Sequence, residues 1–316
     1  MNFRNLLAAA LTLSLVAPYS AAGSDAQQAL ASLDPVFEKF MREQHVPGLV
    51  YGVVADGKLV RVKAFGVGNV PAATPVTADT AFRIASMTKQ FTALATLRLR
   101  DAGRLSLDAP AEAYVPEMRH WRYPTSDSPK ITVRDLLSHA GGLVTDDPWG
   151  DRQLAMSEED FSRLVAGGVP FSRAPGMAYE YSNFGFALQG RVVSNTSRTH
   201  YSRYITDAFL RPLGMPHTTW DYAAVPVGQR AIGYRWENET WIEEPVLGPG
   251  AFGAMGGLIT TTNDYARYVA WVLSAWPPRD GAEDGILRRS SVREMARPAN
   301  YAVPRPAEDP AGCPRS

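Results

Sequence analysis

The sequence FRIASMTKQFTAL, residues 82–94, joins a short apolar segment to the start of a helical pattern. Phe91 and Leu94 stand three residues apart, a spacing that places side chains on one face of a helix. We expect a largely buried helix over about residues 86–100. Because an isolated buried charge is costly, a lysine on such a helix has to be paired or functional, and that lysine is Lys89.

Ser86 and Lys89 are the first candidates for catalysis, because residues three apart share a face of a helix. A serine hydroxyl is a weak nucleophile unless a neighbouring group takes its proton. The lysine ammonium would favour the oxyanion, and the positive end of the helix dipole would add to this effect at Ser86. A solvated serine and lysine on a surface helix fit the same spacing. The apolar residues around Lys89 in the sequence therefore favour the functional interpretation over a surface helix.

Tyr181-Ser182-Asn183 is the second candidate. A tyrosine beside a cation loses its proton more easily and can act as a base, and an asparagine can orient a substrate amide. The same residues also have a structural interpretation, in which Asn183 is the N-cap of a helix over residues 183–195. Alone, the motif favours the cap. Its spacing from Ser86 favours catalysis.

A β-hairpin is predicted near the N-terminus, because Asp56-Gly57 lies between apolar runs and suits a type I′ turn. Before it, we expect a helix over residues 24–45, with Pro35 kinking or restarting it and Asp34 as an N-cap. Gly103 is placed to end the helix that starts near residue 86. The other expected segments are strands at 49–55 and 58–66, a loop at 69–80, and helices at 132–139, 157–166, 183–195, 201–213 and 264–276.

Several strings, taken in order, resemble the serine β-lactamase/penicillin-binding-protein superfamily in its class C β-lactamase-like branch. SMTK at 86–89 is similar to its Ser-x-x-Lys nucleophile motif, and YSN at 181–183 to its Tyr-x-Asn motif. ITVRDLLSHAGGL at 131–143 is similar to the most recognisable block of the family. The other matching strings are GRLSLD at 103–108, PG at 175–176, PLGM at 212–215, and GGL at 256–258 through Asp264. The resemblance covers roughly residues 30–300.

The resemblance implies an α+β fold of the β-lactamase/transpeptidase type, with an antiparallel sheet flanked by helices and a mostly helical subdomain. It implies that Ser86 is the nucleophile and that Lys89 assists its activation. Tyr181 would act as general base and acid, and Asn183 would hold the substrate amide or the lysine. The backbone N–H of Ser86 would be one oxyanion donor. His139 is interpreted as scaffold, and the chemistry implies no metal ion and no cofactor.

One feature of the superfamily has no match in the sequence. Its third motif, Lys-Thr-Gly or His-x-Gly, lies on a sheet strand that lines the site and supplies a second oxyanion N–H. Nothing after Asn183 matches this motif. We therefore expect a C-terminally truncated family member that lacks the C-terminal sheet strands. The hairpin at 49–66 would then keep an unpaired edge.

Composition and charge exclude several classes of protein. The 316 residues carry 32 basic and 32 acidic side chains, so a net charge of zero gives no reason to expect nucleic acid or an anionic membrane as a partner. The one cysteine, Cys313, excludes an internal disulfide and a cysteine-based metal cluster. The 5 histidines show no His-Glu-x-x-His spacing, which argues against a zinc hydrolase.

Residues 1–22 have the pattern of a secretory signal peptide. Arg4 precedes an apolar run at 6–16 that is too short to span a bilayer, and Ser20-Ala21-Ala22 offers small residues for cleavage. No later stretch is long enough to span a membrane. We therefore expect an exported protein, periplasmic or secreted. Its hydrolase domain would cover residues 23–300, followed by a Pro-rich irregular tail at 301–316.

These observations favour an exported serine hydrolase that acts through an acyl-enzyme on an amide or ester. The substrate would be a small molecule or peptide: a β-lactam, a D-amino-acid peptide or a small ester. Two alternatives stay open, namely a non-catalytic relative that binds cell-wall peptide or a partner protein, and an inactive truncated fragment. The presence of Ser86, Lys89 and Tyr181 opposes a pure binding protein, and the missing third motif favours one.

Overall fold

A computed structural model describes residues 27–146 and 149–300. The expected signal peptide, the expected tail and Cys313 lie outside the described residues. The chain divides into two compact units, residues 1–46 and 47–316. In the first unit, helix α2 spans Asp34–Glu43 with Pro35 in its first turn, so the predicted restart of the helix is confirmed. The N-cap is Leu33 rather than Asp34, which instead begins the helix.

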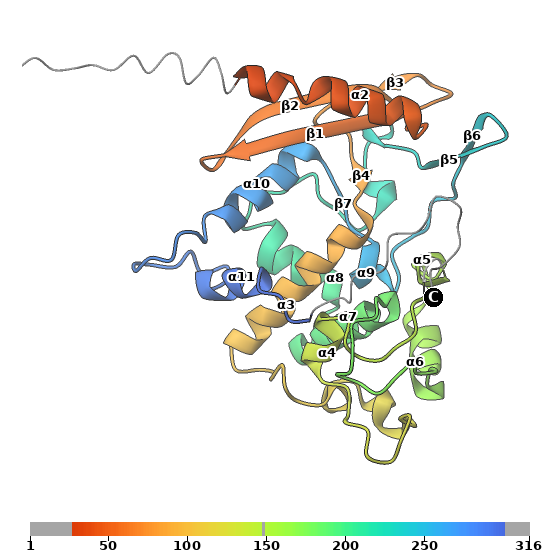
Figure 1. Cartoon of the computed structure of the whole chain (residues 1–316), viewed down its shortest axis with the longest axis vertical. Coiled ribbons are helices and arrows are strands. Elements are labelled where there is room, and N and C mark those ends of the chain that lie inside the picture. The colour runs from red at the N-terminus through yellow and green to blue at the C-terminus, as the bar shows by residue number, and fades with distance from the viewer. Residues whose placement is uncertain (1–26, 147–148, 301–316) are drawn as a thin grey trace, which may run out of the picture. The chain divides into compact units, whose positions relative to one another are not determined.

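The second unit begins with the predicted hairpin, formed by strands β1 (Gly48–Ala55) and β2 (Lys58–Asn69). Asp56 and Gly57 both have positive φ, as a type I′ turn requires. A two-residue strand β3, Thr74–Pro75, lies within the predicted loop and pairs with β2, giving the sheet order β1-β2-β3. Among the described strands β1 therefore lies at an edge, as expected. Helix α10 (Thr262–Leu273) packs against this sheet (Figure 1).

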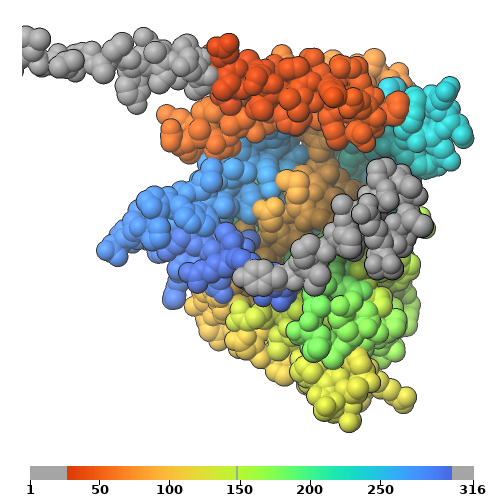
Figure 2. Space-filling view, in the orientation of Figure 1, coloured from red at the N-terminus to blue at the C-terminus, as the bar shows by residue number. Residues whose placement is uncertain are grey.

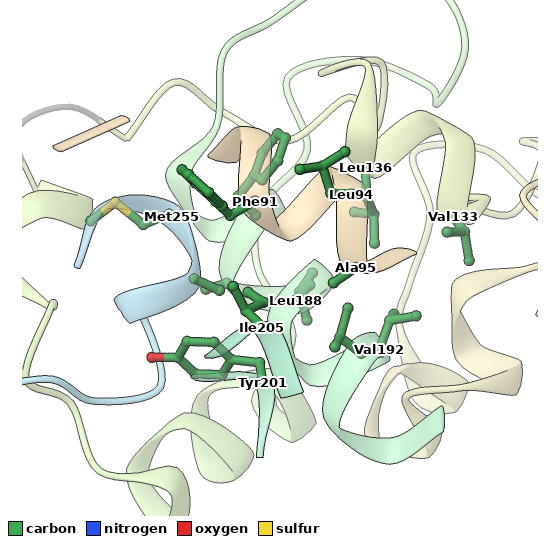
Figure 3. Close-up of a cluster of buried hydrophobic side chains, with 14 of the residues drawn as sticks. Phe91, Leu94, Ala95, Val133, Leu136, Leu188, Val192, Tyr201, Ile205 and Met255 are labelled. Carbon is green, nitrogen blue, oxygen red and sulfur yellow. The ribbon is translucent and has the colours of Figure 1, made fainter. Parts of the chain in front are cut away.

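The core of the second unit is helical. Helix α3 (Lys89–Asp101) follows a 3₁₀ turn at Ala85–Thr88 and ends before Gly103, whose φ of 69° confirms it as the terminating glycine. Figure 3 shows apolar side chains of α3 facing those of α7 (Asn183–Ser197), with Leu94 and Leu188 fully buried. Burying a leucine side chain contributes about 1.5–3 kcal/mol, so this contact is a main source of stability.

The remaining helices and turns surround this pair. The further α-helices are α4 (Val133–Leu137), α5 (Trp149–Arg152), α6 (Glu158–Gly167), α8 (Tyr201–Ile205), α9 (Gly253–Gly256) and α11 (Arg289–Met295). The 3₁₀ turns are Ala111–Ala113, Pro116–His120, Tyr222–Ala224 and Val227–Gln229, and a π-type turn spans Thr206–Leu210. Figure 2 shows the amber surface of α3 beside the blue surface of α11, which packs against it.

Two further strand pairs were not predicted. Strand β4 (Phe82–Arg83) pairs with β7 (Ile259–Thr260), and β5 (Tyr234–Glu237) pairs with β6 (Thr240–Glu243). Strands of two to four residues are too short to show a recognisable alternation of polar and apolar residues. The observed architecture is the mixed helical and antiparallel arrangement of the β-lactamase/transpeptidase type.

Candidate active site

Four side chains singled out in the sequence meet at one point. Ser86 Oγ lies 2.6 Å from Tyr181 Oη and 2.9 Å from Lys89 Nζ. Lys89 Nζ donates a second hydrogen bond to Asn183 Oδ1 at 2.8 Å. Ser86 is exposed, whereas Lys89 and Asn183 are buried. The structure therefore places a solvent-facing hydroxyl between a phenol and an ammonium group.

The surroundings of Lys89 compensate its burial. A third hydrogen bond runs from Lys89 Nζ to the carbonyl of Met255 at 2.8 Å, so each proton of an ammonium group has an acceptor. The ammonium also lies 5.0 Å from the ring centroid of Tyr181 and 5.5 Å from that of Phe186, within the range of cation–π attraction. These contacts stabilise a charged lysine next to the serine oxygen.

Two segments far apart in the sequence position the serine. Pairing of β4 with β7 joins the residues before Ser86 to those after α9, and the Ile84 N–H donates to the Leu258 carbonyl at 3.0 Å. The Leu258 N–H in turn donates to Thr88 Oγ1 at 3.1 Å. These two hydrogen bonds hold the chain on either side of Ser86, and they bring the Met255 carbonyl to Lys89.

Backbone strain is present directly before the serine. Ala85 has φ +45°, a left-handed conformation that is unfavourable for residues other than glycine. Among the described residues, no acceptor receives a hydrogen bond from the Ser86 N–H. This donor is therefore available to a ligand atom.

The N-terminus of α7 holds Asn183 in place. Ser182 is the N-cap and its hydroxyl accepts from the Gly185 N–H, so the interpretation of Asn183 as the cap is wrong. The buried Asp146 carboxylate accepts from the N–H groups of Asn183 and Phe184, both at 2.7 Å. With the backbone held by Asp146 and Ser182, the side chain of Asn183 is free of a capping role and reaches Lys89. Sequence reasoning did not identify Asp146.

His139 lies behind the tyrosine. Its Nδ1 accepts a hydrogen bond from the Ser182 N–H at 3.1 Å, and its ring centroid is 5.0 Å from that of Phe186. Burial, together with the positive charge of Lys89, lowers the pKa of His139 to about 4. Its imidazole is therefore neutral at neutral pH and cannot place a second positive charge beside Lys89.

Two cavities open beside the four residues. One, of about 620 Å³, is lined by Ala85, Met255 and Gly256 together with residues of β4 and of the segment 231–247. The other, of about 570 Å³, is lined by Lys89, His139 and Tyr179 together with residues of α11 and the segment 297–300. The second cavity is lined by Lys89 itself, whereas the first adjoins the site through Ala85 and Met255.

Neither a metal centre nor a membrane span is found in the described part of the chain. In residues 27–146 and 149–300, no cluster of three or more His, Cys, Asp or Glu side chains could hold a metal ion. Over the same residues, no helix is both long enough and apolar enough to cross a membrane.

Comparisons with known proteins find similar sequences over most of the chain. The family model described as Beta-lactamase matches residues 33–315. Among curated proteins, the chain is 30% identical over 261 residues to Protein flp of Staphylococcus aureus strain MW2, covering 81% of this chain and 50% of that protein. It is 32% identical over 263 residues to Beta-lactamase-like protein 2 of Dictyostelium discoideum, covering 79% and 47%. The chain thus spans about half the length of these curated relatives.

Solved structures give the same result. The octameric penicillin-binding protein homologue from Pyrococcus abyssi superimposes with a TM-score of 0.71 at 28% identity, covering 84% of this chain and 59% of that one. A class C beta-lactamase mutant superimposes with a TM-score of 0.64 at 24% identity, covering 78% and 65%. At 24% identity, the similarity to the class C beta-lactamase mutant shows a shared fold alone.

Proposed function

Because the chain belongs to the beta-lactamase family, we propose that it is a serine hydrolase that forms an acyl-enzyme through Ser86. The observation that carries the proposal is the position of Ser86 Oγ between Lys89 Nζ and Tyr181 Oη, at 2.9 and 2.6 Å. The substrate class is an amide or ester: a β-lactam, a D-amino-acid peptide or a small ester.

We infer the direction of the first proton transfer from the hydrogen bonds around Ser86. Lys89 Nζ donates to a lone pair of Ser86 Oγ, which leaves the serine proton directed to Tyr181 Oη. Tyr181 accepts this proton in its phenolate form, which the adjacent ammonium stabilises. Ser86 Oγ then attacks the carbonyl carbon of the substrate, and the Ser86 N–H donates to the developing oxyanion.

The same groups complete the reaction. When the tetrahedral intermediate collapses, the bond to the leaving group breaks and Tyr181 returns the proton to that group. Water then enters and loses a proton to Tyr181 as its oxygen attacks the acyl carbon. Ser86 Oγ leaves and takes the proton back, which restores the starting state. Asn183, fixed by the Asp146 carboxylate, holds Lys89 in position through both steps.

Covalent labelling tests this proposal. We expect a fluorophosphonate probe to add one adduct to the purified wild-type protein, on the peptide that contains Ser86, and none to the Ser86→Ala variant. Intact mass and peptide mapping give the readout, and circular dichroism checks that both proteins are folded. Ser138→Ala is the matched control. The Ser138 hydroxyl is exposed and donates a hydrogen bond to the Arg134 carbonyl. Absence of labelling in folded wild-type protein would favour a binding protein.

We also propose that the protein is exported, on the pattern of residues 1–22. The mass of the mature protein recovered from a bacterial host is expected to match a chain beginning at Gly23. An intact Met1 in a protein retained in the cytoplasm would contradict export without affecting the proposed chemistry.

A further inference from the structure

The larger cavity beside the serine combines apolar walls with a guanidinium group. Its apolar lining includes Phe82, Leu154, Ile232 and Val246, and it begins at Ala85, the residue before Ser86. Arg83 of β4 also lines it. A small molecule bound at Ser86 would therefore reach apolar surface and a cationic side chain in one space.

Arg83 lacks a carboxylate partner in the described part of the chain. Its Nη2 donates to the Leu247 carbonyl at 2.7 Å, and no ion pair joins it to an Asp or Glu there. Burial lowers the pKa of Arg83, which means that its charge is poorly compensated. A half-buried cation without a carboxylate partner favours an anion that can supply one.

Other charged residues also line this cavity, and their partners and exposure distinguish them from Arg83. Glu244 is occupied by Arg235, whose Nη1 donates to it at 2.9 Å. Asp151 and Arg152 are exposed residues of α5 at the rim. Asp151 and Arg152 carry charges of opposite sign, so Arg83 is the half-buried cation of this lining.

The position of Tyr181 separates the acyl side of the site from the leaving-group side. Under the proposed mechanism Tyr181 protonates the leaving group, so that group lies toward Tyr181. The smaller cavity includes His139 and Tyr179, which contact each other beside the tyrosine. The larger cavity is lined by none of these three residues and includes Ala85 and Gly256. With the leaving group assigned to the smaller cavity, the larger one is left for the acyl portion.

We propose that this cavity binds the acyl portion of a substrate that carries a carboxylate on an apolar body, with Arg83 binding the carboxylate. Three peptide units connect the Cα atoms of Arg83 and Ser86, so these atoms lie at most about 11 Å apart. An acyl group of ordinary size therefore spans both sites. A carboxylate also suits the planar, bidentate donor geometry of a guanidinium group.

This inference rests on the proposed function for its orientation, but binding can be measured without turnover. The Ser86→Ala protein is titrated calorimetrically with 3-phenylpropionate, and with 3-phenylpropionamide as the neutral isostere. We expect the carboxylate to bind roughly 10- to 100-fold more tightly than the amide, the range of a charge-assisted pair. Equal affinity for the two probes, or no binding of either, would overturn the assignment of an anion site.

Charge variants in the same Ser86→Ala background locate the site. Arg83→Gln is expected to remove the preference for the carboxylate, and Arg83→Lys to restore part of it. Arg203→Gln is the matched control, because it removes an equal charge from an exposed position on α8 that does not line this cavity, and it is expected to keep the preference. A loss in Arg203→Gln equal to that in Arg83→Gln would assign the effect to general charge and contradict the proposal. Circular dichroism confirms that each variant is folded.

Hydrolysis by the wild-type protein distinguishes this inference from the proposed function. We expect a higher kcat/KM for the p-nitrophenyl monoester of glutaric acid than for p-nitrophenyl butyrate, with this preference lost in Arg83→Gln. Carboxylate binding without any labelling or hydrolysis would refute the proposed function and leave the anion site standing. Hydrolysis of both esters with no preference for the acidic one would refute the acyl-side assignment and leave the hydrolase standing.

Discussion

The imidazole ring of His139 lies against the phenol ring of Tyr181, with centroids 4.5 Å apart and planes inclined by 32°. One face of the proposed base is therefore supported by a ring that is itself fixed by the Ser182 N–H. His139 has a left-handed backbone conformation, with φ +57°. Protonation of the His139 imidazole should therefore affect the stability of the fold near the site.

Because of His139, the protein is expected to become less stable as the pH is lowered from 6.5 toward 4. Its pKa of about 4 lies below the ordinary value of 6.5, so the unfolded chain binds the proton more readily between these pH values. The contribution is fully present above pH 6.5 and is lost as the pH falls toward 4. By linkage it amounts to at most about 3 kcal/mol. Urea unfolding between pH 4 and 7.5 measures it.

His139→Asn is the variant that isolates this effect. Asparagine tolerates positive φ and places an acceptor oxygen near the position of Nδ1, so the Ser182 N–H keeps a partner. We expect the variant to be less stable at pH 7.5, because the ring contact is lost, and to show a flatter dependence of unfolding free energy on pH. His120→Asn, at an exposed histidine, serves as control. An unchanged slope in His139→Asn would contradict the assignment.

Tyr181→Phe is expected to slow acylation and leave the fold intact. The change removes only Oη, which lies 2.6 Å from Ser86 Oγ, and it keeps the ring that packs against His139. Loss of a general base reduces rate by about 10²–10⁴-fold. The rate of fluorophosphonate labelling, followed by intact mass, gives the measurement.

Tyr179→Phe provides the comparison for that variant, because Tyr179 also contacts the His139 ring, at 5.5 Å, and is 41% exposed. It is expected to be labelled at the wild-type rate. If labelling slowed equally in the two variants, the effect would come from ring packing. That result would contradict the assignment of the Tyr181 hydroxyl as the base.

Asp146→Ala is expected to destabilise the protein and to slow labelling of Ser86. The variant leaves two buried N–H groups, of Asn183 and Phe184, without their acceptor. Hydrogen bonds to a charged group contribute about 1.5–3 kcal/mol each, and partial access of water to the space left behind brings the expected loss to about 2–4 kcal/mol. Asp160→Ala removes an exposed carboxylate near the start of α6 and should cost much less. Denaturant unfolding compares the two.

Two glycine-to-alanine changes are expected to act in opposite directions. At Gly190 in α7, an added Cβ would lie 2.4 Å from the Cβ of Ala254 in α9. Overpacking of this kind costs about 1–3 kcal/mol, and moving α9 would also displace the Met255 carbonyl from Lys89. At Gly167, the last residue of α6, the added Cβ meets nothing within 4 Å.

Gly167→Ala is therefore expected to be neutral or to stabilise by up to about 1 kcal/mol through helix propensity. Thermal unfolding of both variants, combined with the labelling rate of Ser86, tests the pair. A stable, fully labelled Gly190→Ala protein would show that α9 adjusts without moving Met255.

Local chemistry in the sequence predicted the elements that short segments can specify. Asp56-Gly57 predicted the turn because both residues accept positive φ, and Gly103 predicted the end of α3 for the same reason. Ser86, Lys89, Tyr181 and Asn183 were selected from their side-chain chemistry and their motif spacing. The structure brings all four together. The helix start was less accurate, since a 3₁₀ turn at 85–88 precedes α3.

Only the tertiary structure decided which distant groups complete the site. The Met255 carbonyl reaches Lys89 because β4 pairs with β7, and a pairing of two residues leaves no periodic pattern to read. Asp146 acts on Asn183 across 37 positions, and Arg83 lines a cavity formed with the segment 231–247. A sequence determines turns, glycine helix ends and motif side chains through contacts between neighbours along the chain. Contacts between residues far apart depend on the packing of the whole core, so they became visible only in the folded chain.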